Sequence, residues 1–510
     1  MSQLSLPGRE HEIAGGKPEE GHDSSLADPL PCVVFDPKQE SRLWRKVDLR
    51  LMPMIALMYL LSFMDRGVAS VIGIDLLDLT GNQYNTVLTV FFISFAIFES
   101  PCNVIIQFVS PSKWLAGIMI LWGIVMYVKP SYYSVNSPTS VKDAFGFCKD
   151  ISSIGCWATL SRDRRNLTMW YPKYMLQCRF AIFLGAATSS GAFSGLLAYG
   201  INFMDGIGGL RGWSWIFILE GLVTVLVGFI AIFGMIIVPR EWNSLENSNI
   251  VMVDYPSSAK FLTPEEKQFI IQRREFSQVD DGGDIGAQIR GAFMDWQIWA
   301  LSLIQISALV PLYGITYFLP TIINDFGYST STSQLLTVPP YVLAVIVLGV
   351  FAYYSDKKKL RSPFIFTAQL IALIGFIINI TDASSGVKYF GTFWCVAGSY
   401  TAGTGPVIWA ANNLEGKYKR AVGMALVITM GTFGGAIASN IFRAQDAPRY
   451  LLGFGIEIMF MVMGMLVIPI VALAYVRLNT RKDELEIQME TSGFRSRAEA
   501  SNEEKFRYTL

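Results

Sequence analysis

Long apolar stretches separated by short polar ones dominate the chain from residue 51 to residue 476. A transmembrane helix needs about 20 mostly apolar residues to span the hydrocarbon core of a bilayer. Eleven stretches approach or exceed that length, at 51–72, 87–109, 114–128, 176–201, 213–238, 297–322, 334–354, 363–380, 389–411, 421–442 and 451–476. The pattern predicts an all-α membrane protein that crosses the bilayer many times.

Basic residues in the loops test this count, because cytosolic loops carry an excess of Lys and Arg. Such clusters lie at 42–50, before the first stretch, and at 357–361, 417–420 and 477–482. With eleven spans the three later clusters would lie across the membrane from the first. One more crossing between residues 128 and 176 restores agreement. We therefore predict twelve spans, with both termini in the cytosol.

The region that must supply this crossing is poorly suited to a membrane. Residues 144–167 contain Lys149, Asp150 and the run Arg162-Asp163-Arg164-Arg165. Each charge near the centre of a span costs about 2.5–3.5 kcal/mol. We expect an atypical fourth helix here. A disturbed reading frame across 149–167 is one hypothesis for the pattern, and a transcript that encodes these residues in frame would contradict it.

Two equal sets of spans around a polar centre suggest the major facilitator architecture, in which substrate binds midway between two six-helix halves. We expect a disordered cytosolic tail at 1–46, halves at 47–238 and 294–477, a cytosolic loop at 239–293 and a cytosolic tail at 478–510. In the central loop, Thr263 and Glu266 have the spacing of a capping box, which predicts a short amphipathic helix there.

Composition excludes several classes of function. Hydrophobic residues make up 52% and charged residues 16%, whereas soluble proteins are about a quarter charged. A net charge of zero argues against nucleic-acid binding. The two histidines lie in the N-terminal tail, and the six cysteines have no metal-ligand spacing. No nucleophile–base pair or phosphate loop stands out. We therefore expect no enzyme, no metal site and no cofactor.

An acid and a base, Asp65 and Arg66, lie side by side in the first apolar stretch. A charge at that depth costs a few kcal/mol, so it normally faces a cavity and marks a substrate or proton path. The alternative is that the two residues only pair, or that Arg66 reaches the outer interface. Neighbouring residues point about 100° apart on a helix, which favours a separate partner for each.

Several long motifs carry a resemblance to a known family. They are LTGNQYN at 79–85, FESPCN at 98–103 and WSWIFILEG at 213–221, followed by WAANN at 409–413 and GGAIASNIF at 434–442. In this order they resemble the fungal allantoate permease family, the anion:cation symporter branch of the major facilitator superfamily, over residues 44–477. The resemblance implies proton-coupled uptake of a small organic anion, such as nicotinate, pantothenate or allantoate, at the plasma membrane. We expect a monomer that is driven by the proton gradient.

Candidate residues for proton coupling and for the first substrate contact lie in the first half. Arg66 is expected to bind the substrate carboxylate through charge-assisted hydrogen bonds. Asp65 is expected to exchange the proton, because the neighbouring charge and the low dielectric bias its protonation. Glu99 in the second span is a further proton-coupling candidate.

The second half supplies the remaining substrate contacts. Tyr313 and Tyr317 share one face of the seventh span, and Asn412 and Asn413 end the tenth. The two halves are expected to rock about a midplane cavity. The glutamate that related symporters carry in the fourth helix is absent here. The alternative function is therefore a nutrient sensor that does not transport, or an inactive relic.

Overall fold

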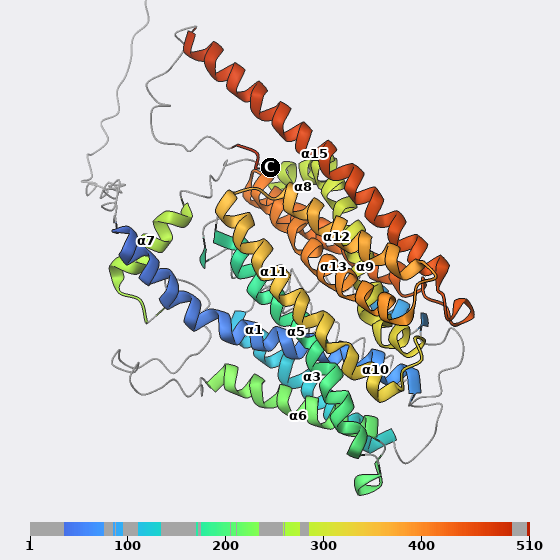
Figure 1. Ribbon diagram of the computed structural model, residues 1–510. Coiled ribbons are helices and arrows are strands. Elements are labelled where there is room, and N and C mark those ends of the chain that lie inside the picture. The colour runs from blue at the N-terminus through green and yellow to red at the C-terminus, as the bar shows by residue number, and fades with distance from the viewer. Residues whose placement is uncertain are drawn as a thin grey trace, which may run out of the picture.

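The computed structural model of the 510-residue chain describes residues 35–75, 85–94 without 87, 111–133, 170–171, 175–233 without 205 and 211, 259, 261–275, 285–491 and 507–509. Within some of these helices the side chains lie outside the described part, including those of 65–75, 111–115 and 128–133. The regular structure of the described residues is helical throughout (Figure 1).

Four long helices belong to the first half: α1 (Pro37–Asp75), α3 (Pro111–Tyr133), α5 (Leu176–Ile201) and α6 (Gly212–Phe233). A helical segment at 88–94 lies between α1 and α3 in sequence. Glycines let α3 and α6 approach closely, since a Cβ atom at Gly123 would lie 2.8 Å from the carbonyl oxygen of Gly221. Small residues allow the same close contact in other membrane proteins.

The relative direction of α3 and α5 bears on the additional crossing that the loop charges predict. The two helices run in the same direction, because Trp122 and Met126, in the middle and latter part of α3, and Ile201 at the end of α5 share one cluster with Ile216 near the start of α6. Helices α3 and α5 therefore begin at the same face of the bundle. This agrees with the additional crossing that the loop charges require. The charged stretch 144–167 itself lies outside the described residues.

The second half contains a helix for each of its six expected spans. They are α9 (Trp296–Asn324), α10 with α11 (Thr330–Leu336 and Val338–Lys358), α12 (Ser362–Ile380), α13 (Ser385–Asn413), α14 (Lys417–Ala438) and α15 (Leu451–Thr491). Helix α13 is the interior element, packed against α9, α11, α12 and α14. Most of the second part of α13 is buried. Its Gly, Ser, Thr and Asn residues there are therefore in contact with protein and not with lipid.

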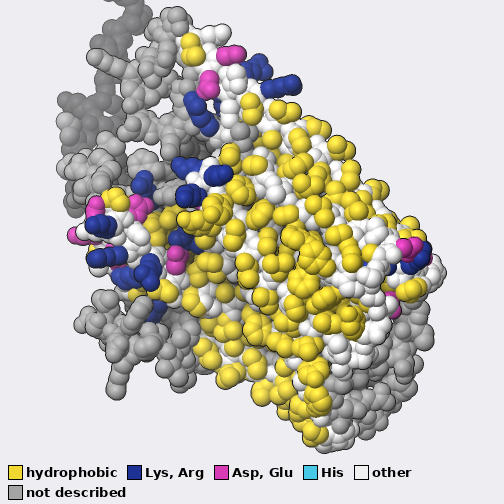
Figure 2. All heavy atoms as spheres, in the orientation of Figure 1, with side chains coloured by type: hydrophobic (Ala, Val, Ile, Leu, Met, Phe, Trp, Pro, Cys, Tyr) yellow, Lys and Arg dark blue, Asp and Glu magenta, His cyan; other side chains and the backbone are white. Residues whose placement is uncertain are grey.

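Apolar side chains cover most of the described bundle surface on the face that Figure 2 shows. On α15, Leu466, Ile470 and Leu473 are 64%, 63% and 59% exposed. Monomeric soluble proteins rarely carry continuous apolar surface of this kind. Eight of the described helices are long and apolar enough to cross a membrane. The protein is a multi-pass membrane protein, as the hydrophobic pattern predicts.

Charged side chains collect at the ends of the bundle. The face where α1, α9 and α14 begin and where α11 and α13 end carries Lys46, Lys357, Lys358, Lys419 and Arg477. We call it the basic face, and we call the other end of the bundle the opposite face.

The first helix starts ten residues before the expected boundary at 47. Helix α1 begins at Pro37 because Leu43, Trp44 and Val47, all at most 3% exposed, pack into the core. A short helix, α7 (Pro264–Glu275), lies against this extension (Figure 1), and Lys46 Nζ lies 3.0 Å from Glu266 Oε2. The polar residues at the chain start are therefore partly helical.

The capping box in the central loop is confirmed. The backbone N–H of Glu266 donates to Thr263 Oγ1 at 3.2 Å, and the backbone N–H of Thr263 donates to Glu266 Oε2 at 2.9 Å. A second short helix, α8 (Ile285–Met294), follows α7 and leads into α9.

Candidate functional site

A cavity of about 30 Å³ lies where the two halves meet. Its wall comes from α1, α5, α9, α10, α11 and α13, so both halves contribute to it. The lining residues are Phe63, Ser190, Gly191, Ser194, Gly195, Leu312, Tyr313, Thr316, Tyr317, Pro320, Gln334, Thr337, Tyr341 and Tyr400. A buried water needs roughly 10–15 Å³, so the cavity has room for two or three waters in this conformation.

Hydroxyl groups form the polar part of the cavity wall. Thr316 Oγ1 lies 3.0 Å from the hydroxyl of Tyr400, and the ring of Tyr341 packs edge-on against that of Tyr400 with a centroid distance of 5.8 Å. Pro320 has no N–H to donate to the carbonyl of Thr316, so this α9 turn also lacks one backbone hydrogen bond. Thr316 Oγ1 donates its hydrogen to the carbonyl oxygen of Leu312 at 2.6 Å, so it accepts from Tyr400. The hydroxyls of Tyr341 and Tyr400 can turn to donate to a carboxylate, but the described wall contains no cation.

An aromatic side chain of the first half reaches into the second half beside the cavity. The ring of Phe92 is fully buried and lies 4.9 Å from that of Tyr313 and 5.8 Å from that of Tyr317. A side chain on Gly435 of α14 would overlap this ring. Tyr313 and Tyr317, both predicted substrate contacts, therefore line the cavity and also meet the other half.

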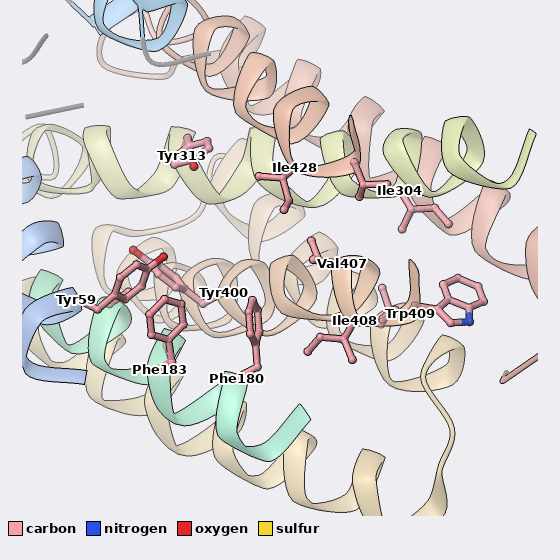
Figure 3. Packing of buried hydrophobic residues seen from close by; sticks show 14 of the residues in the cluster. Tyr59, Phe180, Phe183, Ile304, Tyr313, Tyr400, Val407, Ile408, Trp409 and Ile428 are labelled. Atoms are coloured by element: carbon pink, nitrogen blue, oxygen red, sulfur yellow. The ribbon is translucent and has the colours of Figure 1, made fainter. Parts of the chain in front are cut away.

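Further rings connect α1 and α5 on the other side of the cavity. Tyr59 stacks on Phe183 with a centroid distance of 3.7 Å and lies 4.6 Å from Phe63. Figure 3 shows Tyr59 from α1 beside Phe183 and Phe180 from α5, with Tyr400 of α13 near them.

At the opposite face, hydrogen bonds join the first half to the end of α14. Asn85 Nδ2 donates to the carbonyl oxygen of Phe442 at 2.9 Å. Asn440 Nδ2 donates to Thr89 Oγ1 at 2.7 Å, and Thr89 Oγ1 lies 2.9 Å from Ser439 Oγ. These contacts close the cavity toward that face.

At the basic face, a carboxylate of the second half binds the start of α5. Asp356 Oδ2 accepts from the backbone N–H of Cys178 at 2.7 Å, where the dipole of α5 favours a negative charge. Its other oxygen accepts from Arg361 Nη2 at 2.8 Å. The described residues of the two halves thus touch at both ends, and we call this arrangement the occluded conformation. The cavity must widen before it can hold a substrate larger than a few waters.

The start of α5 is also fastened to α1. Arg179 makes a two-pronged ion pair with Asp48, at 2.8 Å from Nε to Oδ1 and 2.8 Å from Nη2 to Oδ2. Tyr171 donates to Asp48 Oδ1 at 2.6 Å. Burial, followed by the charge of Asp48, raises the pKa of Tyr171 above its ordinary value. Its hydroxyl therefore remains a donor over the physiological range.

The backbone of α1 places Asp65 and Arg66 on different faces. Residues 59, 63 and 66 form one stripe at helical spacing, and Phe63 lines the cavity. Residues 54, 58, 61 and 65 form another stripe, whose described members pack against α3 and α6. The separation agrees with the expectation of separate partners. The side chains of Asp65 and Arg66, and all of Glu99, lie outside the described residues.

Asn412 and Asn413 lie at the basic face, 12 and 13 residues after Tyr400 on α13, which corresponds to about 18–20 Å along the helix. The structure does not bring them to the cavity in this conformation. Asn412 is buried, and its Oδ1 has no hydrogen-bond partner in the described part. Their assignment to the substrate stays a prediction.

Asn413 binds the end of the chain. Its Nδ2 donates to the carbonyl oxygen of Thr509 at 3.0 Å, and its Oδ1 accepts from the backbone N–H of Thr509 at 2.7 Å. Asn479 of α15 holds Tyr508 in the same two-way manner, at 2.9 Å in both directions. The segment 507–509 therefore bridges α13 and α15.

Replacing Asn413 with Ala is expected to release this segment, because each lost hydrogen bond is worth about 1 kcal/mol and Asn413 accepts or donates three. Trypsin should then cleave faster after Arg507, which mass spectrometry of the intact protein detects. The neighbouring Asn412→Ala serves as the control and should leave the rate unchanged. Equal cleavage in both variants and the parent would contradict the bridge.

The structure contains a buried acid that was not among the residues predicted from the sequence. Glu457 of α15 is 0% exposed, and neither carboxyl oxygen has a hydrogen-bond partner in the described part. The signal was present in the sequence, since Glu457 is the sole charged residue in the apolar stretch 451–476. A lone charge in a span is the same indication that singled out Asp65 and Arg66.

Comparisons with known proteins agree with this geometry. The family model described as Major Facilitator Superfamily matches residues 55–439. An MFS-type transporter, cnsO, of Penicillium expansum is 30% identical over 453 residues, covering 85% of this chain and 83% of that protein. A high-affinity nicotinic acid transporter of Saccharomyces cerevisiae is 29% identical over 451 residues, covering 87% of this chain and 79% of that protein.

Solved structures share the fold. The proton:xylose symporter XylE superposes with a TM-score of 0.58 at 16% identity, covering 82% of this chain and 94% of that one. A bacterial homologue of the human lysosomal transporter Spinster, in an inward-facing and occupied conformation, gives 0.56 at 15% identity, covering 87% and 99%. With its helical halves, the cavity between them and a family match over most of its length, this chain belongs to the Major Facilitator Superfamily.

Proposed function

We propose that this protein takes up a small organic anion together with a proton by alternating access. The observation that carries the proposal is the cavity between the halves, closed at each end by a separate set of contacts. Breaking the contacts of Asp356 would open the basic face, and breaking those of Asn85 and Thr89 would open the opposite face. Opening one set at a time is what alternating access requires.

The chemistry of the cavity supports an anionic substrate. The hydroxyls of Tyr341 and Tyr400 in its wall can donate hydrogen bonds to a carboxylate. The face of α1 that bears Phe63 continues to residue 66, so an arginine lies on the stripe that borders the cavity. In this proposal Arg66 binds the carboxylate, and the rings of Tyr313 and Tyr317 contact the rest of the molecule.

A monocarboxylate of vitamin size is the proposed substrate class. The motif resemblance to allantoate permeases and the nicotinic acid transporter among the relatives support it. Asp65 and Glu99 remain the proposed proton-coupling residues of the first half, and the proton gradient supplies the energy. The cavity lies within one chain, so a monomer suffices.

The proposed orientation places the basic face in the cytosol, following the positive-inside rule. Both termini then lie in the cytosol, since α1 begins and α15 ends at that face. We propose the plasma membrane as the location, because uptake of external nutrients occurs there.

Radiolabelled uptake tests the function directly. Cells that lack their own carriers would express this chain, or a version in which 149–167 carry a family-like fourth helix. Nicotinate, pantothenate and allantoate would be offered at acidic and neutral external pH. We expect acid-stimulated uptake of at least one, because an inward proton gradient drives the symport.

Each outcome has a distinct reading. Uptake by the chain as it stands would show that residues 149–167 are compatible with transport. Uptake by the altered version alone would indicate a symporter with a damaged fourth helix. If neither takes up any of the three anions, the proposed substrate class is wrong, and binding without flux would favour a sensor.

A further inference from the structure

We propose that Glu457 is a protonation site of the second half, through which proton binding controls the position of α9. The inference rests on the proposed proton-coupled function and adds a residue to it. It begins from the geometry of one buried carboxyl group, which lies behind the wall of the cavity.

The Glu457 carboxyl occupies a notch that a glycine leaves in α9. A Cβ atom at Gly314 would overlap Glu457 Oε1, would lie 2.8 Å from its Cδ and would be 3.3 Å from Cε2 of Phe442. Gly314 directly follows Tyr313, and Tyr313, Thr316 and Tyr317 line the cavity. Thus the carboxyl touches the helix that supplies five of the lining residues.

The surroundings of Glu457 offer no charge to balance it. In the described part, Phe442 lies beside it, and the thiol of Cys395 on α13 is within electrostatic range. No described cation forms an ion pair with it. An unpaired charge buried inside a membrane protein costs several kcal/mol. The occluded conformation can therefore hold Glu457 as the neutral acid at far lower cost than as the anion.

Protonation and conformation are coupled for this reason. A carboxylate at Glu457 would favour a conformation in which α9 moves away from α15 and water or a donor reaches the oxygens. The neutral acid favours the packed conformation described here. A ligand, in this case a proton, shifts a conformational equilibrium by its difference in affinity for the two states.

The position of Glu457 suits exchange with the opposite face. It lies six residues into α15 from Leu451, about 9 Å along the helix. Phe442, its neighbour, accepts the hydrogen bond of Asn85 that joins the halves there. When that contact opens, a Glu457 carboxylate oxygen can accept a proton from water, which forms one O–H bond and removes one negative charge.

A second group of polar residues lies further along the contact between α9 and α15, toward the basic face. Ser307 on α9 and Gly464 on α15 are each seven residues from Gly314 and Glu457, toward the basic face. Gln369 Nε2 donates to Ser307 Oγ at 2.8 Å, and its Oε1 has no partner in the described part. This group lies about 10 Å from Glu457 along the helices. Release of the proton toward the basic face, which breaks the O–H bond of Glu457 and restores the anion, therefore requires water to enter between Glu457 and this group.

Two measurements test this assignment. Infrared difference spectra of the purified protein at low and high pH should contain the carbonyl band of a protonated carboxylic acid, and Glu457→Gln should remove one such component. In proteoliposomes, Glu457→Gln should exchange labelled for unlabelled substrate without a proton gradient at near the parent rate, while the stimulation by acid is lost. Glu457→Asp keeps the acid and should retain both the band and the acid stimulation.

The readouts separate failure of this inference from failure of the proposed function. If the parent shows no acid-stimulated uptake, the symport proposal fails, and the infrared band still decides whether Glu457 binds a proton. An unchanged band in Glu457→Gln would overturn the inference. It would also be overturned if Glu457→Gln and Glu457→Asp lost acid stimulation equally, because side-chain packing rather than protonation would then be responsible.

Discussion

Replacing Arg66 with Gln is expected to abolish uptake of the carboxylate substrate while leaving the protein in the membrane. The change removes the positive charge from the stripe of α1 that borders the cavity through Phe63. A hydrogen bond to a charged group contributes about 1.5–3 kcal/mol, so losing a two-pronged pair corresponds to at least about a hundredfold in affinity. The described wall offers hydroxyls but no other cation to replace it.

The measurement is uptake normalised to the amount of protein at the cell surface. Arg66→Lys is the informative control, because it keeps the charge but loses the planar fork of the guanidinium, and we expect weak residual uptake. The uncharged amide of the substrate should be rejected by the parent. Normal uptake by Arg66→Gln would refute the role of Arg66.

Replacing Gly191 with Val is expected to reduce transport by about fivefold to 150-fold, since overpacking costs roughly 1–3 kcal/mol. Gly191 of α5 lies against the ring of Tyr341 of α11, and a Cβ atom there would lie 2.6 Å from Tyr341 Cε1. A side chain would force α5 and α11 apart beside the cavity. The occluded conformation would lose stability, and each transport cycle must pass through it.

The control for Gly191→Val is Gly349→Val on α11, where a Cβ atom has no neighbour within 4 Å. Both variants introduce the same β-branched side chain into a helix, so the difference between them reports the contact. Substrate uptake and thermal stability in detergent would be measured for each. Equal uptake by the two variants would show that close packing of α5 and α11 is not needed for transport.

The helices of this fold can be predicted from the sequence because the interactions that form them are local. An apolar run of about 20 residues has to satisfy its backbone hydrogen bonds internally in a bilayer, and a helix does so. The expected span 176–201 has the bounds of α5, and 363–380 differs from α12 by one residue. The capping box of Thr263 is equally local, and it forms as predicted.

The residues of the candidate site could be predicted only in part from the sequence. Tyr313 and Tyr317 share a face, and that face borders the cavity. Their partners Phe92 and Tyr400 come from distant parts of the chain, and no local pattern connects them. Asn412 and Asn413 were selected for their amide chemistry, which does not reveal at which level of α13 the cavity lies.

Thus the sequence by itself determined the class of protein, the position of the described spans and several of their boundaries, because hydrophobicity and loop charge act residue by residue. Only the tertiary structure decided which side chains meet. It placed Gly191 against Tyr341, Asn413 against the end of the chain, and Glu457 in the notch at Gly314. These contacts depend on how helices far apart in the chain pack together, which no single stretch of sequence encodes.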